Sequence, residues 1–213
     1  MNKDSKKKTK GLYQLLGILL LCLTIVVFSY NVTLAWFRDQ SITSNSPDIT
    51  IVGTIDLDVS TNFKFDNLAF APDTTYLQDA NGESLATTIK TTDDHNIDGA
   101  FVRVKWTNNR SEISLHFGSN VTTSSSYSAS DENKWYYNSA DEYYYYIGIV
   151  NNTAVNFNTG YYVDNTLYNE KAGALVEMSF VVEGIQKQYG AYKEEWTTAP
   201  EIFKSYASSK TGY

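Results

Sequence analysis

Side chains able to do chemistry are few and scattered in this chain of 213 residues. The two histidines, His95 and His116, stand in "TTDDHNID" and "ISLHFGS", and neither belongs to the H-E-x-x-H pattern of a zinc protease. The single cysteine, Cys22, lies in an apolar run, and the sequence has neither a G-x-S-x-G nucleophile motif nor a glycine-rich phosphate loop. We therefore expect a protein that is not an enzyme, with no catalytic residue and no cofactor.

One acidic cluster invites a metal interpretation. Asp93, Asp94, His95, Asn96 and Asp98 offer the oxygen ligands that calcium prefers. Their spacing differs from that of a known calcium loop, which favours a solvated acidic turn and predicts no metal site. The calcium alternative stays open at this point.

The N-terminal region has the pattern of an export signal. Residues 1–10 carry five lysines and one aspartate, and residues 11–30 carry no charge, which predicts membrane insertion through this run with the basic end in the cytoplasm. About 20 helical residues span a hydrocarbon core roughly 30 Å thick, so the length also fits a retained anchor. Ala35, with Thr33 two positions before it, favours cleavage by a signal peptidase between Ala35 and Trp36.

Composition after this run fits an exported domain. The chain has 17 basic and 24 acidic residues, of which 12 and 23 follow residue 35, and an acidic surface of this size repels nucleic acid. The same part has no cysteine and must be stabilised by burial. We predict a signal peptide or anchor at 1–35, an extended segment at 36–47 and a folded domain at 48–213, located outside the cell or on its surface.

Period-2 alternation of apolar and polar residues predicts strands. It is clearest in "ITIVGTIDLDVS" (49–60), "FVRVKW" (101–106) and "GALVEMSFVVEG" (173–184), each with one apolar and one wetter face. Polar turn-forming stretches separate them. We expect an all-β domain, an antiparallel β-sandwich of jelly-roll or Greek-key type. The segment "APEIFKSYAS" (199–208) fits either a short terminal helix or coil.

The run "YYYY" (143–146) places two tyrosine rings on each face of a strand. Rings that stack on sugars, or on a second chain, are two interpretations of the outer pair. We favour ordinary strand packing, because tyrosine favours strands and buries its ring while its hydroxyl reaches water.

Three stretches of the chain read "TLAWFRD" (33–39), "IVGTIDLDVS" (51–60) and "SFVVEGIQ" (179–186). Together they resemble the TasA and camelysin-type family of Gram-positive bacteria. "TLAWFRD" (33–39) resembles the small residue, aromatic pair and acidic residue at the cleavage site of that family. "IVGTIDLDVS" (51–60) resembles its Gly-Thr-aliphatic-Asp-Leu strand, and "SFVVEGIQ" (179–186) resembles its late strand. The resemblance covers the two ends of the chain, and the middle does not align by eye.

The resemblance implies a secreted jelly-roll subunit of biofilm-matrix fibres, processed by a SipW-type signal peptidase. It implies that the freed N-terminal segment adds as a strand to the next subunit or to a related matrix protein, with Trp36, Phe37 and Asp39 in the assembly segment. The alternative is a membrane-anchored surface adhesion or binding module that uses exposed tyrosines.

Overall fold

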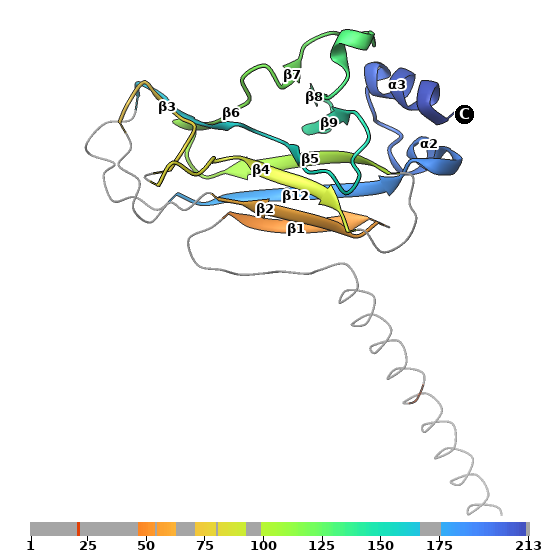
Figure 1. Ribbon diagram of the computed structural model, residues 1–213, viewed down its shortest axis with the longest axis horizontal. Helices are drawn as coiled ribbons and strands as arrows, with labels where there is room; N and C mark the ends of the chain where they lie inside the picture. The colour runs from red at the N-terminus through yellow and green to blue at the C-terminus, as the bar shows by residue number, and fades with distance from the viewer. Residues whose placement is uncertain are drawn as a thin grey trace, which may run out of the picture. The chain divides into compact units, whose positions relative to one another are not determined.

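The computed structural model describes residue 21 and residues 47–53, 55–62, 71–79, 81–92, 99–166 and 176–211. Contacts divide the chain into two compact units, residues 1–39 and residues 40–213, and every strand and helix named below belongs to the second unit. Many more of its described residues lie in strands than in helices, which confirms the predicted all-β class (Figure 1).

The largest sheet has six strands in the order β1-β12-β5-β9-β8-β7. Their bounds are β1 Asp48–Gly53, β12 Met178–Gln186, β5 Ala100–Asn108, β9 Tyr143–Ile147, β8 Lys134–Asn138 and β7 Val121–Thr122. The central pairs are antiparallel, as predicted. Both edge pairs, β1 with β12 and β7 with β8, are parallel, so the antiparallel prediction is wrong at the two edges.

The described residues also form two antiparallel sheets of three strands each. One has the order β10-β4-β2, with bounds Val155–Asn156, Thr87–Thr91 and Leu57–Thr61, and the other has the order β3-β11-β6, with bounds Thr74–Tyr76, Gly160–Val163 and Ile113–His116. The described helical elements are η1 Ala129–Asp131, η3 Gln188–Gly190, α2 Tyr192–Glu195 and α3 Glu201–Thr211.

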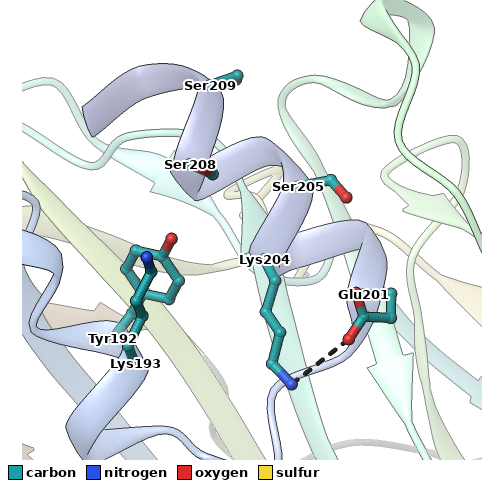
Figure 2. Close-up of a pocket in the computed structure, with 7 residues that line it drawn as sticks. All are labelled: Tyr192, Lys193, Glu201, Lys204, Ser205, Ser208 and Ser209. Atoms are coloured by element: carbon teal, nitrogen blue, oxygen red, sulfur yellow. Dashed lines mark ion pairs between the residues drawn. The ribbon is translucent and has the colours of Figure 1, made fainter. Parts of the chain in front are cut away.

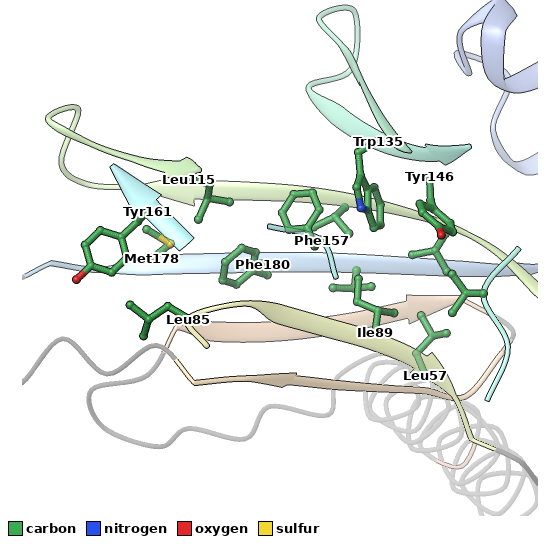
Figure 3. Close-up of a cluster of buried hydrophobic side chains, with 14 of the residues drawn as sticks. Leu57, Leu85, Ile89, Leu115, Trp135, Tyr146, Phe157, Tyr161, Met178 and Phe180 are labelled. Atoms are coloured by element: carbon green, nitrogen blue, oxygen red, sulfur yellow. The ribbon is translucent and has the colours of Figure 1, made fainter. Parts of the chain in front are cut away.

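The main core lies on one face of the six-stranded sheet, which we call the inner face. Val102, Val104, Phe180 and Val182 point into this core from β5 and β12, as the alternation predicted. Side chains of the two smaller sheets meet them, among them Ile89 of β4 and others shown in Figure 3. Because all three sheets contribute fully buried aliphatic and aromatic groups to this one core, the hydrophobic effect stabilises their packing.

The stretch at 49–60 forms two strands in different sheets, although its alternation reads as one continuous pattern. β1 ends at Gly53, whose φ is +130°, and β2 begins at Leu57 in the sheet that also holds β4. Ile49 and Ile51 from β1 and Leu57 from β2 nevertheless contact the same core. The alternation continues across the break because the two strands, although in different sheets, both turn their apolar residues toward one core.

A second core covers the outer face of the six-stranded sheet. Phe101, Tyr145, Ile147 and Ile185 of the sheet pack there against the C-terminal helical segment. That segment contributes Tyr192, Trp196, Ile202, Phe203, Tyr206 and Ala207. In α3 the buried residues recur at helical spacing and Pro200 directly precedes the first turn, so the helical alternative for 199–208 is confirmed.

Candidate functional site

The predicted cleavage and assembly residues, Ala35, Trp36, Phe37 and Asp39, lie outside the described residues, as does residue range 11–30 apart from residue 21. So do the acidic residues at 93–98. Pro47 is the first described residue after the predicted cleavage and assembly residues. It is buried and directly precedes β1. The candidate assembly segment at 36–47 therefore leads straight into the first strand of the six-stranded sheet.

β1 is an edge strand. It pairs with β12 in parallel from Asp48 opposite Ser179 to Gly53 opposite Gly184. Within the described ranges no strand pairs with its other side. Each of its six residues is half-buried or exposed, whereas Phe180 and Val182 of β12 are fully buried. Unpaired N–H and C=O groups on such an edge are a template for a further strand.

Two stretches that carry the family resemblance meet at the end of β1. Gly53 of "IVGTIDLDVS" is paired with Gly184 of "SFVVEGIQ". A Cβ on Gly53 would fall far inside contact distance of the Gly184 carbonyl oxygen, and a Cβ on Gly184 would lie 2.9 Å from Cδ1 of Leu57. A side chain at either position would push the strands apart at the place where the chain passes from the six-stranded sheet to the sheet that holds β2. We call this place the corner.

A group of interacting charged and phenolic side chains lies on the outer face, from β12 across β5 to β9 and the turn before β9. Arg103 Nε donates to Glu183 Oε2 at 2.7 Å, and its Nη1 donates to the Tyr145 hydroxyl at 2.9 Å. Asp141 Oδ2 lies 3.7 Å from Arg103 Nη1 and accepts from Tyr145 at 2.6 Å. Tyr143 donates to Glu183 Oε1 at 2.5 Å.

The C-terminal segment closes this group, which we call the Arg103 network (Arg103, Asp141, Tyr143, Tyr145, Glu183 and Thr198). Thr198 Oγ1 donates to Asp141 at 2.9 Å. The Arg103 guanidinium lies 4.1 Å from the centroid of the Tyr143 ring and 4.9 Å from that of Trp196. Only 13 to 16% of the side-chain surface of the three charged residues is exposed. The network therefore joins the sheet to the helical cover by charge-assisted hydrogen bonds.

The surroundings of the Arg103 network favour the neutral form of its tyrosines and the charged form of its arginine. Burial, together with the hydrogen bond to Asp141, raises the pKa of Tyr145 to about 12. Burial and the hydrogen bond to Glu183 also raise the pKa of Tyr143. Burial opposes the charge of Arg103, but the hydrogen bond with Tyr145 and the charge of Glu183 outweigh it, so the pKa of Arg103 is raised. Neither phenol is activated as a base or nucleophile, and the arrangement is suited to holding structure.

The run at 143–146 divides its rings between the two cores. Tyr144 stacks on Phe117 with centroids 4.9 Å apart at the inner face, and Tyr146 packs on Trp135 there. Tyr145 packs on Phe203 of α3 at the outer face, and Tyr143 lies over Arg103. Strand packing therefore accounts for all four rings, and none of the four is exposed.

Other candidate groups are ordinary in the described part of the chain. His116 Nδ1 lies 3.0 Å from Thr159 Oγ1 at the end of β6. Where side chains are described, no three histidine, cysteine, aspartate or glutamate residues come together as a metal site. Among the helices that can be described, none has the length and apolarity needed to cross a membrane. A hollow of about 660 Å³ lies beside α2 and α3 (Figure 2).

Sequence reasoning missed the Arg103 network and the helical cover over the outer face. Arg103 stands in "FVRVKW" at a position expected on the wetter face, and its partners Asp141 and Glu183 lie far along the chain. The buried face of α3 had a local signal, the spacing of Ile202, Phe203 and Tyr206. No local pattern indicated that α3 packs against the outer face of the six-stranded sheet.

Comparison with known proteins identifies no relative: no family model, no curated protein and no solved structure matches this chain.

Proposed function

We propose that this chain is a secreted or cell-surface structural protein, a fibre subunit that assembles by donor-strand addition. The proposed architecture is a β-sandwich of jelly-roll type, preceded by a hydrophobic signal or anchor helix at 1–35. The observation that carries the proposal is the edge position of β1, directly after the segment at 36–47. That segment is the donor, and the open side of β1 in a neighbouring copy is the acceptor.

The character of β1 supports its role as the acceptor. A strand of six residues offers several main-chain hydrogen bonds to an added strand, whereas the opposite edge, β7, has two residues. Ile49 and Ile51 are only partly buried against the core. A donor strand that carries Trp36 and Phe37 would cover apolar surface there as well as satisfy the main chain.

Cleavage after Ala35 by a SipW-type peptidase is part of this proposal, because it frees Trp36 as a new N-terminus. N-terminal sequencing of the extracellular protein tests the step. Recovery of the intact chain in membranes would show a retained anchor.

Assembly is tested by comparing a chain that begins at Trp36 with one that begins at Pro47, using sedimentation and electron microscopy. Filaments from the longer chain alone identify the segment as the donor. If both chains remain monomeric at high concentration, the fibre proposal fails.

The acceptor is tested separately with Thr50→Lys, because a lysine on an edge strand hinders addition of another strand. The matched control is Thr88→Lys, which adds the same side chain to β4 at a half-buried position that is paired on both sides, with Ser60 and with Asn156. Thr50→Lys should reduce filament formation and Thr88→Lys should not. Equal effects of the two substitutions would remove β1 from the proposal.

A further inference from the structure

The connection between β3 and β4 carries a dipeptide that can change chemically without an enzyme. Asn81 is followed by Gly82, and this is the only Asn-Gly pair in the sequence. Asparagine is a thermolabile residue, and a glycine after it has no side chain to shield the main-chain nitrogen from the asparagine amide. Both residues are exposed. The pair lies outside the two cores and takes no part in the proposed strand addition.

The surroundings of Gly82 leave room for a reaction at its nitrogen. Its φ is +83°, in the left-handed region that glycine tolerates. A Cβ placed on Gly82 would meet no atom within 4 Å apart from its own chain neighbours. The Gly82 N–H donates to the Asp79 carbonyl oxygen at 3.1 Å. Because hydrogen bonds on exposed main chain open readily, this bond limits access to the nitrogen only part of the time.

The Asp79 side chain holds the turn in its closed form. Its Oδ1 accepts hydrogen bonds from the main-chain N–H groups of Asn81 and Glu83, each at 2.8 Å. Asn81 Nδ2 donates to Asp79 Oδ2 at 3.4 Å. The hydrogen bond from Glu83 is the main cause of a lowered pKa of Asp79, so this acceptor stays charged. One carboxylate therefore governs how often the turn opens.

We propose that Asn81 is a site of spontaneous deamidation, at a rate limited by the hydrogen bonds of Asp79. The Gly82 nitrogen loses its proton and forms a bond to Asn81 Cγ. The bond from Cγ to Nδ2 breaks, and the side-chain nitrogen leaves as ammonia. A water molecule then opens the resulting cyclic imide at either of its carbonyl groups, which leaves aspartate or isoaspartate at position 81.

The product disturbs the turn in which it forms. The amide that donates to Asp79 becomes a carboxylate, so like charges repel where a hydrogen bond was. Isoaspartate also lengthens the main chain by one carbon. The N–H of the buried Leu85 donates to the Leu77 carbonyl at 3.0 Å across the same turn. Because the change is irreversible, the chain before β4 should loosen gradually as the protein ages.

The test incubates the full chain, in a mild detergent and a warm, mildly alkaline buffer, and maps its peptides by mass spectrometry over time. Conversion should concentrate at Asn81. Asn152, which is also exposed but precedes the β-branched Thr153, serves as the reference within the same chain and should stay largely unchanged. Asp79→Ala should convert on the order of fivefold faster, the size expected for the loss of one or two exposed hydrogen bonds. Gly82→Ala should convert several times more slowly, because its methyl group crowds the nitrogen.

The matched control is Asp73→Ala, which removes an exposed aspartate whose side chain accepts a hydrogen bond from Tyr162. It should convert at position 81 as the natural chain does, and thermal unfolding checks that every variant is folded. A synthetic peptide of residues 77–85 gives the rate without the fold and should convert faster than the natural chain. The proposal is overturned if Asn81 in the folded chain converts no faster than Asn152. Equal rates in Asp79→Ala and Asp73→Ala would overturn the role of Asp79.

Discussion

Replacing Arg103 by methionine should destabilise the domain far more than loss of an ordinary surface charge. The substitution leaves the Glu183 and Asp141 carboxylates without their guanidinium, and these groups are 16% and 13% exposed. Breaking a buried ion pair by removing one partner typically costs about 3–5 kcal/mol. The contacts of Arg103 with the Tyr143 and Trp196 rings are lost as well. We expect a loss of about 3–5 kcal/mol, a large share of the roughly 5–15 kcal/mol typical of a domain.

Urea unfolding followed by tryptophan fluorescence measures this loss, since Trp196 lies beside the substitution. The matched control is Lys105→Met, two residues further along the same face of β5. Lys105 pairs with Glu142 at 2.5 Å, but 64% of the Glu142 side chain is exposed. An exposed ion pair is worth about 0–1 kcal/mol, so the control should lose less than about 1 kcal/mol.

A second substitution identifies the cause of the loss. If the uncompensated Glu183 carboxylate is responsible, adding Glu183→Gln to Arg103→Met should restore part of the stability, because a neutral amide costs less to bury. An Arg103→Met loss equal to that of Lys105→Met, with no recovery on adding Glu183→Gln, would refute the reasoning.

Three further tests concern the corner at Gly53 and Gly184, the helical cover of the outer face and the tyrosines of the Arg103 network. Gly53→Ala should cost about 3 kcal/mol or more and Gly184→Ala about 1–3 kcal/mol in urea unfolding, because the first meets backbone at a φ of +130° and the second meets a side chain that can shift. Phe203→Ala should cost about 3–5 kcal/mol by the same measurement, since the ring is fully buried, and the exposed Ser205→Ala should change little. The folded-state pKa of Tyr145 is raised, so the stability that its neutral form contributes should be fully present below pH about 10 and should be lost as the pH rises through about 12. The urea midpoint, measured across this range, should therefore fall less steeply with pH in Tyr145→Phe than in the natural chain.

The strands were predictable from sequence where one strand has one buried face. Alternation at 101–106 and 173–184 identified the faces of β5 and β12 that meet the inner core. Alternation also misled at 49–60, because it reports which face is buried and not which sheet a strand joins. The break at Gly53 is a change in the backbone conformation, and a glycine in a strand pattern is compatible both with a continuous strand and with a break.

The outer face shows what local patterns leave undetermined. Two rings of the tyrosine run point away from the inner core, and the sequence allowed a sugar, a second chain or the chain itself to cover them. The structure covers them with residues 192–207, whose apolar positions were visible but whose target was not. The Arg103 network could not be predicted for the same reason. Taken alone, Arg103 and Glu183 are ordinary polar strand residues and Asp141 lies in the turn before β9. Only the registers of β5 with β9 and β12 bring these groups together.

The meeting of Gly53 and Gly184 limits what the family resemblance can support. Two of the three resembling stretches have a packing reason for their glycines, since each glycine permits a close approach at the same corner. A resemblance in those stretches therefore carries no information about activity. The remaining stretch, "TLAWFRD", lies outside the described residues, and the proposed processing and assembly rest on it. For this reason the comparison of chains that begin at Trp36 and Pro47 tests the proposed function more directly than any substitution in the folded domain.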